Sequence, residues 1–125
     1  MKISKLKSLG TFALLSTLVP GAVVSGPADV VDVAVTCAER CRFDVTVRHA
    51  DSGWQHYADQ WDVLALDGTV LGSRVLLHPH VDEQPFTRSL GNVQIPSGID
   101  RVVIRARDSL HGWGGREIEV TLPAR

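Results

Sequence analysis

Five histidines are the side chains of this sequence best suited to metal chemistry. Neutral imidazole nitrogens bind zinc, copper and iron. Because protons compete with a metal for these nitrogens, metal occupancy should fall as the pH drops below about 6.5. Histidines on loops can also be solvated residues that titrate without consequence, or can line a pocket for a ligand or partner. The choice depends on whether the fold brings together His49, His56, His78, His80 and His111.

Short runs of alternating apolar and polar residues indicate strands with one buried face. Turn residues such as Asp67-Gly68 and Pro96-Ser97-Gly98 separate the runs. We expect an all-β fold, a small immunoglobulin-like antiparallel β-sandwich of about seven strands with Trp61 in its core. A small barrel is the alternative. The expected strands cover residues 31–36, 43–48, 61–65, 70–77, 86–95, 101–107 and 118–122.

The connections between these strands should alternate between the two ends of the sandwich, because successive strands run in opposite directions. One end then receives the tight turns at residues 37–41, 67–68 and 96–98. The other end receives residues 49–57, 78–85 and 108–115, which hold every histidine of the chain. We therefore expect the histidines to share one end of the molecule.

Side-chain parity along the strands predicts which residues point inward at this end. His49 continues the inward series of residues 43, 45 and 47, and Asp108 continues that of residues 102, 104 and 106. His78 and His80 share a face, although Pro79 indicates an edge strand or a strand exit there. Parity therefore allows His49 and Asp108 to converge at this end, and it places His78 and His80 on one face.

Two segments resemble the iron domain of the superoxide reductase (desulfoferrodoxin) family. His49-Ala-Asp-Ser-Gly-Trp-Gln-His56-Tyr57, followed by Trp61 and Asp67-Gly68, resembles the family's histidine-rich loop, Tyr-Ile-x-Trp strand and Asp-Gly hairpin. Asp108-Ser-Leu-His111-Gly-Trp is similar to its Cys-Asn-x-His-Gly segment. The resemblance implies an immunoglobulin-like sandwich, with iron held by four histidines and a cysteine thiolate.

Carried over by residue, the resemblance places His49, His56 and His111 at ligand positions and Asp108 at the thiolate position. The fourth histidine could be His78 or His80. Loss of the thiolate removes the electron-donating ligand with which the family reduces superoxide. The resemblance therefore implies a metal site with imidazole and carboxylate ligands.

A second pattern, similar to the cupin metal motif, also involves the paired histidines. Gly72 precedes His78-x-His80, Glu83 follows, and Pro96-x-Gly98 lies downstream. The acid comes one residue early, and Arg101 stands where a cupin has its last histidine. This pattern is the alternative metal motif of the chain.

The N-terminal segment has the features of an export signal. A basic head precedes an apolar run over residues 9–19, and Pro20-Gly21 ends that run. We expect a signal peptide over residues 1–25, with cleavage after Ser25 or as late as Ala28, and a domain over residues 29–123. No cysteine lies beside the cleavage region, which argues against a lipid-anchored precursor. The predicted location is periplasmic or secreted, with no stable membrane insertion after cleavage.

Cleavage would remove every lysine and leave ten arginines against fourteen acidic residues, a net charge of −4. This balance argues against nucleic acid as a partner. In an exported chain Cys37 and Cys41 should form a disulfide that closes the first hairpin.

The function predicted from the sequence is binding of a transition metal ion (iron, copper or zinc) by an exported protein, for storage, transfer, sensing or redox work. A non-catalytic immunoglobulin-like module that binds a protein or carbohydrate partner is the alternative.

Overall fold

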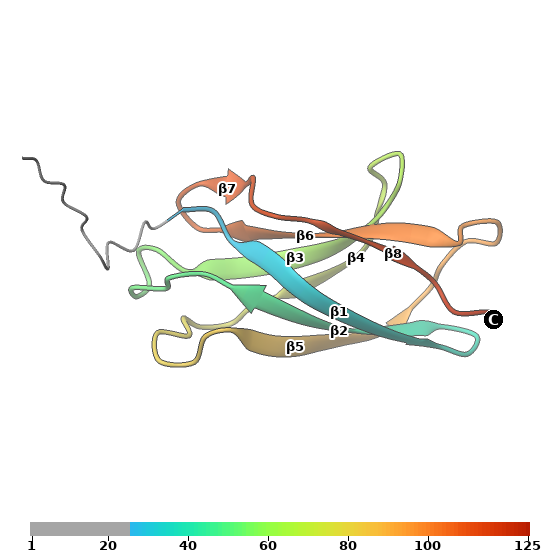
Figure 1. Cartoon of the computed structure of the whole chain (residues 1–125), viewed down its shortest axis with the longest axis horizontal. Helices are drawn as coiled ribbons and strands as arrows, with labels where there is room; N and C mark the ends of the chain where they lie inside the picture. The colour runs from blue at the N-terminus through green and yellow to red at the C-terminus, as the bar shows by residue number, and fades with distance from the viewer. Residues whose placement is uncertain (1–25) are drawn as a thin grey trace, which may run out of the picture.

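The computed structural model describes residues 26–125, which form two antiparallel β-sheets packed into a sandwich (Figure 1). One sheet has the strand order β1-β2-β5, and the other has the order β4-β3-β6, with β7 and β8 both paired to β6. The predicted signal peptide lies outside the described residues. The strands are β1 (Asp29–Cys37), β2 (Cys41–Arg48), β3 (Ala58–Ala65), β4 (Val70–Val75), β5 (Phe86–Val93), β6 (Arg101–Asp108), β7 (Gly112–Trp113) and β8 (Ile118–Thr121).

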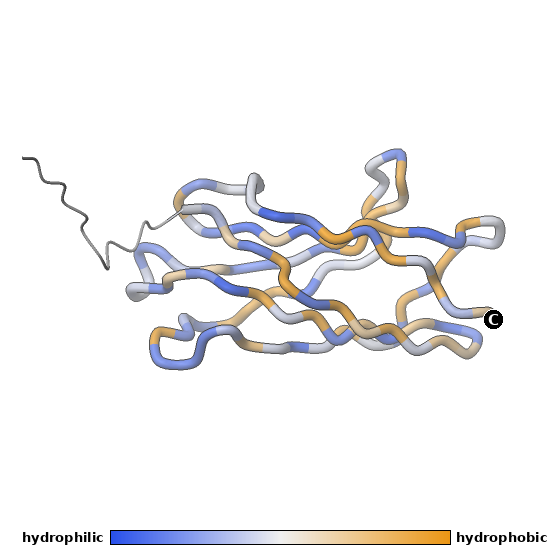
Figure 2. The backbone as a smooth tube through the Cα atoms, viewed as in Figure 1, coloured by the Kyte–Doolittle hydropathy of each residue, from blue (hydrophilic) through white to orange (hydrophobic). Residues whose placement is uncertain are grey.

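The core lies between the sheets and is built from alternate residues of the strands. Phe43 of β2, Trp61 of β3 and Ile104 of β6 are each fully buried. Figure 2 shows the matching alternation of hydrophobic and hydrophilic residues along the chain. Burial of a large apolar side chain stabilises a fold by about 1.5–3 kcal/mol, so this alternation determines which face of each strand turns inward.

The all-β sandwich predicted from the sequence is confirmed, with eight strands in place of about seven. The additional strand, β7, is two residues long. The immunoglobulin-like assignment stays a prediction. The expected first strand began at residue 31, and strict alternation from there would turn Val31 inward. In β1 the fully buried valine is Val30, because the pairing with β2 shifts between Val30 and Asp32 and changes the parity.

The long connections gather at one end of the sandwich, on the left in Figure 1. They follow β2, β4 and β6, and they carry all the histidines. Tight turns occupy the other end, where Cys37 and Cys41 form a disulfide across the β1–β2 hairpin. Within residues 26–125, no helix has the length and hydrophobicity that crossing a membrane requires.

The segment between β7 and β8 is held against the start of β1. The amide of Arg116 donates a hydrogen bond to Asp29 Oδ1 (2.7 Å), and the amide of Val30 donates one to the carbonyl of Arg116 (2.9 Å). A Cβ atom on Gly115 would lie 1.8 Å from the carbonyl oxygen of Ala28. Only glycine permits this close approach, which fixes the path of the chain from β6 to β8.

Candidate metal centre

Asp108, the last residue of β6, lies at the centre of the histidine cluster. Its Oδ2 atom is 2.8 Å from His49 Nε2, 2.8 Å from His56 Nε2 and 2.8 Å from His111 Nδ1. The aspartate side chain is completely buried. One carboxylate oxygen therefore faces three imidazole nitrogens, two from the β2–β3 connection and one from the β6–β7 connection.

The second oxygen of Asp108 organises the turn that carries His111. Oδ1 accepts hydrogen bonds from the backbone amides of Leu110 (3.1 Å) and His111. Ser109, in the same turn, donates its amide to the carbonyl of Tyr57 (2.9 Å), and its Oγ accepts the amide of Tyr57 (3.1 Å). These bonds connect the turn after β6 to the segment next to His56.

His56 is presented by a tight turn between β2 and β3. The His56 amide donates to the carbonyl of Gly53 (3.1 Å), and the amide of Ser52 donates to the carbonyl of His56 (3.0 Å). Gly53 has a φ of 145°, a backbone conformation that residues other than glycine rarely adopt. The turn directs His56 toward Asp108.

His49 lies between two buried carboxylates. Its Nε2 atom faces Asp108, and its Nδ1 atom lies 2.6 Å from Asp51 Oδ1. Asp51 also accepts the backbone amides of Ala58 (2.9 Å) and His80 (2.7 Å). If a metal ion replaced the proton on Nε2, the Nδ1 proton would stay on the Asp51 side and Nε2 would offer its lone pair to the metal, which is the arrangement that metal-binding histidines use.

Burial and hydrogen bonding act in opposite directions on the two carboxylates. Burial raises the pKa of Asp108, but hydrogen bonds from His111, His56 and His49 outweigh it and leave this pKa below the ordinary value. Burial likewise raises the pKa of Asp51, and bonds from His49 and from backbone amides reverse the effect. Both carboxylates are therefore ionised at neutral pH.

The pKa of His49 moves the other way. Burial lowers it, yet hydrogen bonds and charge interactions with Asp51 and Asp108 give a net rise above the ordinary value. The two carboxylates would stabilise a proton bound to Nε2, and they would stabilise a metal cation there for the same reason.

The donor atoms suit a metal ion in both chemistry and spacing. The ligand atoms of His49, His56 and Asp108 all lie within 4.8 Å of one another. Bonds of about 2.0–2.2 Å to imidazole nitrogen and carboxylate oxygen keep the ligand atoms of one ion within about 4.4 Å of one another, so the observed spacing is close to the one required. The His56 ring is also edge-on to both other rings, with centroids 4.7 Å from His49 and 5.0 Å from His111. His49, His56 and Asp108 could hold a cation at this position, and His111 lies beside them.

His78 and His80 were predicted as further ligands, but their rings make other contacts. The His80 ring stacks on Phe86 (centroid distance 3.9 Å), and its Nε2 atom lies 2.8 Å from Arg88 Nη2. Because arginine only donates, the lone pair of Nε2 is used by that contact. His78 Nδ1 lies 3.0 Å from the carbonyl oxygen of Pro79. His80 reaches the centre only through its backbone amide, bonded to Asp51.

Trp54 and Trp113 flank the histidines in sequence and could have shielded or plugged this end. Trp54 is 62% exposed. Trp113 instead lies against Arg105, whose guanidinium carbon is 3.9 Å from the ring centroid.

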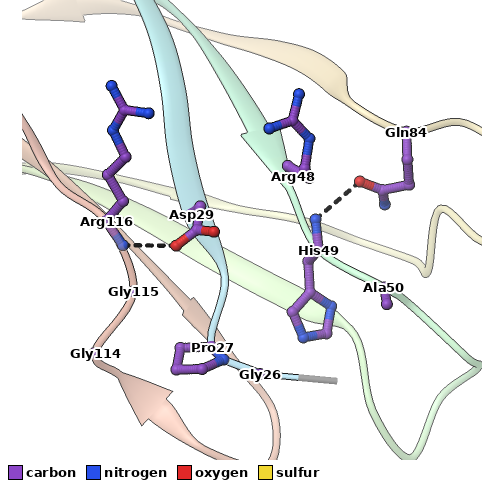
Figure 3. A pocket seen from close by; sticks show the side chains of 10 residues that line it. All are labelled: Gly26, Pro27, Asp29, Arg48, His49, Ala50, Gln84, Gly114, Gly115 and Arg116. Atoms are coloured by element: carbon purple, nitrogen blue, oxygen red, sulfur yellow. Dashed lines mark hydrogen bonds between the residues drawn. The ribbon is translucent and has the colours of Figure 1, made fainter. Parts of the chain in front are cut away.

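A pocket of about 530 Å³ borders the centre at His49. Figure 3 shows the His49 ring and Pro27 together, with the guanidinium groups of Arg48 and Arg116 directed away from them. Both His49 nitrogens contact buried carboxylates. The pocket therefore meets the ring without reaching a free nitrogen.

No protein-family model and no solved structure matches the chain. The chain is similar to a protein of Halomicrobium mukohataei named "Putative lipoprotein". The two sequences are 44% identical over 95 residues, which cover 74% of this chain. The match covers 46% of the relative, so the chain spans about half the length of the protein it matches.

Proposed function

We propose that this protein binds one transition metal ion through His49, His56 and Asp108, with His111 as a further ligand. The observation that carries the proposal is the convergence of three imidazole nitrogens on Asp108 Oδ2, each at 2.8 Å. Solvated loop histidines would not meet at a buried carboxylate. Asp51 supplies the outer carboxylate that orients His49 and makes it a stronger ligand.

Imidazole and carboxylate ligands suit zinc, copper and iron. The superoxide reductase resemblance is part of this proposal as an account of the scaffold and of the ligand positions. Asp108 at the thiolate position is a harder and weaker electron donor than sulfur. We therefore propose metal binding or transfer as the role of the site, without the reductase chemistry of the resembled family.

We also propose that the protein acts after export, in the periplasm or outside the cell. The similar protein of Halomicrobium mukohataei is named "Putative lipoprotein", and lipoproteins are an exported class. The predicted signal peptide over residues 1–25 supports the same location.

Recognition of a protein partner is a second candidate function for the same end of the molecule. Four large apolar side chains on the three long connections are more than half exposed: Trp54, Leu77, Val81 and Leu110. Exposed apolar groups gathered in this way are common where proteins bind each other.

Metal titration of single-alanine variants tests the first proposal. Protein purified without an affinity tag should bind one equivalent of zinc or copper, measured by calorimetry and by elemental analysis. His49→Ala, His56→Ala and Asp108→Ala should each weaken binding by about tenfold or more. His78→Ala is the matched control, because this exposed histidine lies at the same end and contacts its neighbouring backbone.

Circular dichroism of each variant would establish that it remains folded. Wild-type affinity in all three folded variants would contradict the proposed site. Loss of binding in His78→Ala alone would move the site to the connection between β4 and β5.

A further inference from the structure

The four side chains of the centre differ sharply in their exposure to solvent. The side chains of Asp108 and His49 are 0% and 1% exposed, that of His56 is 10% exposed, and that of His111 is 39% exposed. The centre is thus closed on the His49 side and open on the His111 side. A metal ion or an incoming ligand would meet His111 first.

The contacts of His49 block the opposite approach. Its two nitrogens lie 2.6 Å and 2.8 Å from the buried carboxylates of Asp51 and Asp108. The pocket beside His49 borders the ring (Figure 3), but movement of a metal through it would require both contacts to break. Entry of a metal on the His111 side would leave both contacts of His49 intact.

The ring of His111 can move without disturbing its backbone. Its Nδ1 atom contacts Asp108 Oδ2, whereas its backbone amide is held separately by Asp108 Oδ1. Rotation of the side chain would break the first bond and leave the second intact. Gly112, with a φ of 75°, then turns the chain directly into β7.

We propose that His111 is the exchangeable ligand of the centre and that the metal enters and leaves on its side by ligand exchange. The His111 ring would first leave the metal, an incoming imidazole, carboxylate or thiolate would then bond at the vacated position, and the metal would keep its charge and oxidation state. The partner class is therefore a second metal-binding molecule that delivers or accepts the ion. This inference rests on the proposed metal function.

Zinc release to a chelator tests the exchange route. Zinc-loaded protein is mixed in a stopped-flow instrument with increasing concentrations of a chromophoric chelator. For the wild type, the rate should rise with chelator concentration and then level off, because movement of the His111 ring becomes limiting. In His111→Ala this position is permanently open, so release should be about tenfold faster or more and should not level off.

His78→Ala is again the control and should release zinc as the wild type does. A wild-type rate independent of chelator concentration, or an unchanged plateau in His111→Ala, would overturn the exchange route while leaving metal binding intact. A wild-type protein that binds no zinc would overturn the proposed function and this inference together.

Chemical modification gives an independent measurement that does not depend on a variant. Diethyl pyrocarbonate modifies accessible imidazoles, and peptide mass spectrometry identifies the modified residue. Zinc should protect His111 by about tenfold, the scale expected for a ligand, and should leave the exposed His78 unprotected. Equal modification of His111 with and without zinc would contradict its assignment as a ligand.

Discussion

At the scale of single residues, the centre depends on two carboxylates with different tasks. Asp108 gathers the three imidazoles with Oδ2 and fixes the turn after β6 with Oδ1. Asp51 faces the far nitrogen of His49, so the nitrogen next to Asp108 would be the one to bind a metal ion. Hydrogen bonds to charged groups are stronger than those between neutral groups, so this pair can hold the ring of His49 in one orientation.

Asp51→Asn tests the role of the outer carboxylate. At pH 8 zinc affinity should fall by about 10–100-fold. Asp51 also raises the pKa of His49, so protons displace the metal from the wild type at a higher pH than they would from an ordinary histidine. The substitution should therefore lower the pH below which zinc affinity begins to fall.

The measurement is a zinc titration repeated at several pH values, with Asp82→Asn in an exposed turn as the control. A purely structural role of Asp51 would lower affinity without moving the pH dependence. That result would contradict the proposed effect on His49.

Several residues of the centre could be predicted from the sequence. Parity placed His49 and Asp108 inward, and both are buried there. Asp51 was missed because an acid in a polar loop resembles a solvated residue; the only signal was its position between two candidate ligands. The contacts of His80 with Phe86 and Arg88 depend on a pairing with β5 that local sequence does not specify.

At the scale of elements, strand ends position the centre. His49 follows β2, His56 precedes β3 and Asp108 ends β6, so each of these candidate ligands is within two residues of a paired strand. β3 and β6 are direct neighbours, with Ala58 opposite Asp108. The hydrogen-bonded strands therefore hold the backbone of these three residues in place.

Gly115→Ala tests whether the segment after β7 must lie against β1. The added Cβ would meet the carbonyl oxygen of Ala28 at 1.8 Å, a backbone atom that cannot rotate away. The free energy of unfolding in urea should fall by about 1–3 kcal/mol, as for other overpacked sites. Gly91→Ala is the control, because nothing lies within 4 Å of its Cβ position. Equal stability of both variants and the wild type would contradict this close approach.

The sequence predicted the longer strands, but it predicted neither the shortest strand nor the irregular pairing of β1. Alternation located the seven longer strands, whereas β7 has two residues and therefore no period to detect. The irregular pairing near Val31 changed the parity of β1, which depends on its contacts with β2 and not on its own residues.

At the scale of the whole molecule, the sandwich keeps the disulfide and the histidine cluster at opposite ends. The disulfide lies at the end with tight turns, and the histidines lie at the other end (Figure 1). This separation followed from counting strands, because antiparallel neighbours alternate the ends at which connections fall. The division of the strands between the two sheets could not be obtained in that way, since it depends on packing over the whole chain.

The location of a bound metal ion tests the central claim most directly. Crystals of the zinc-loaded protein, measured at the zinc absorption edge, would give an anomalous difference map. The predicted peak lies about 2.0–2.2 Å from His49 Nε2, His56 Nε2 and Asp108 Oδ2. A peak beside His78 and His80, or no peak at Asp108 in crystals that contain one zinc per chain, would contradict the proposed centre.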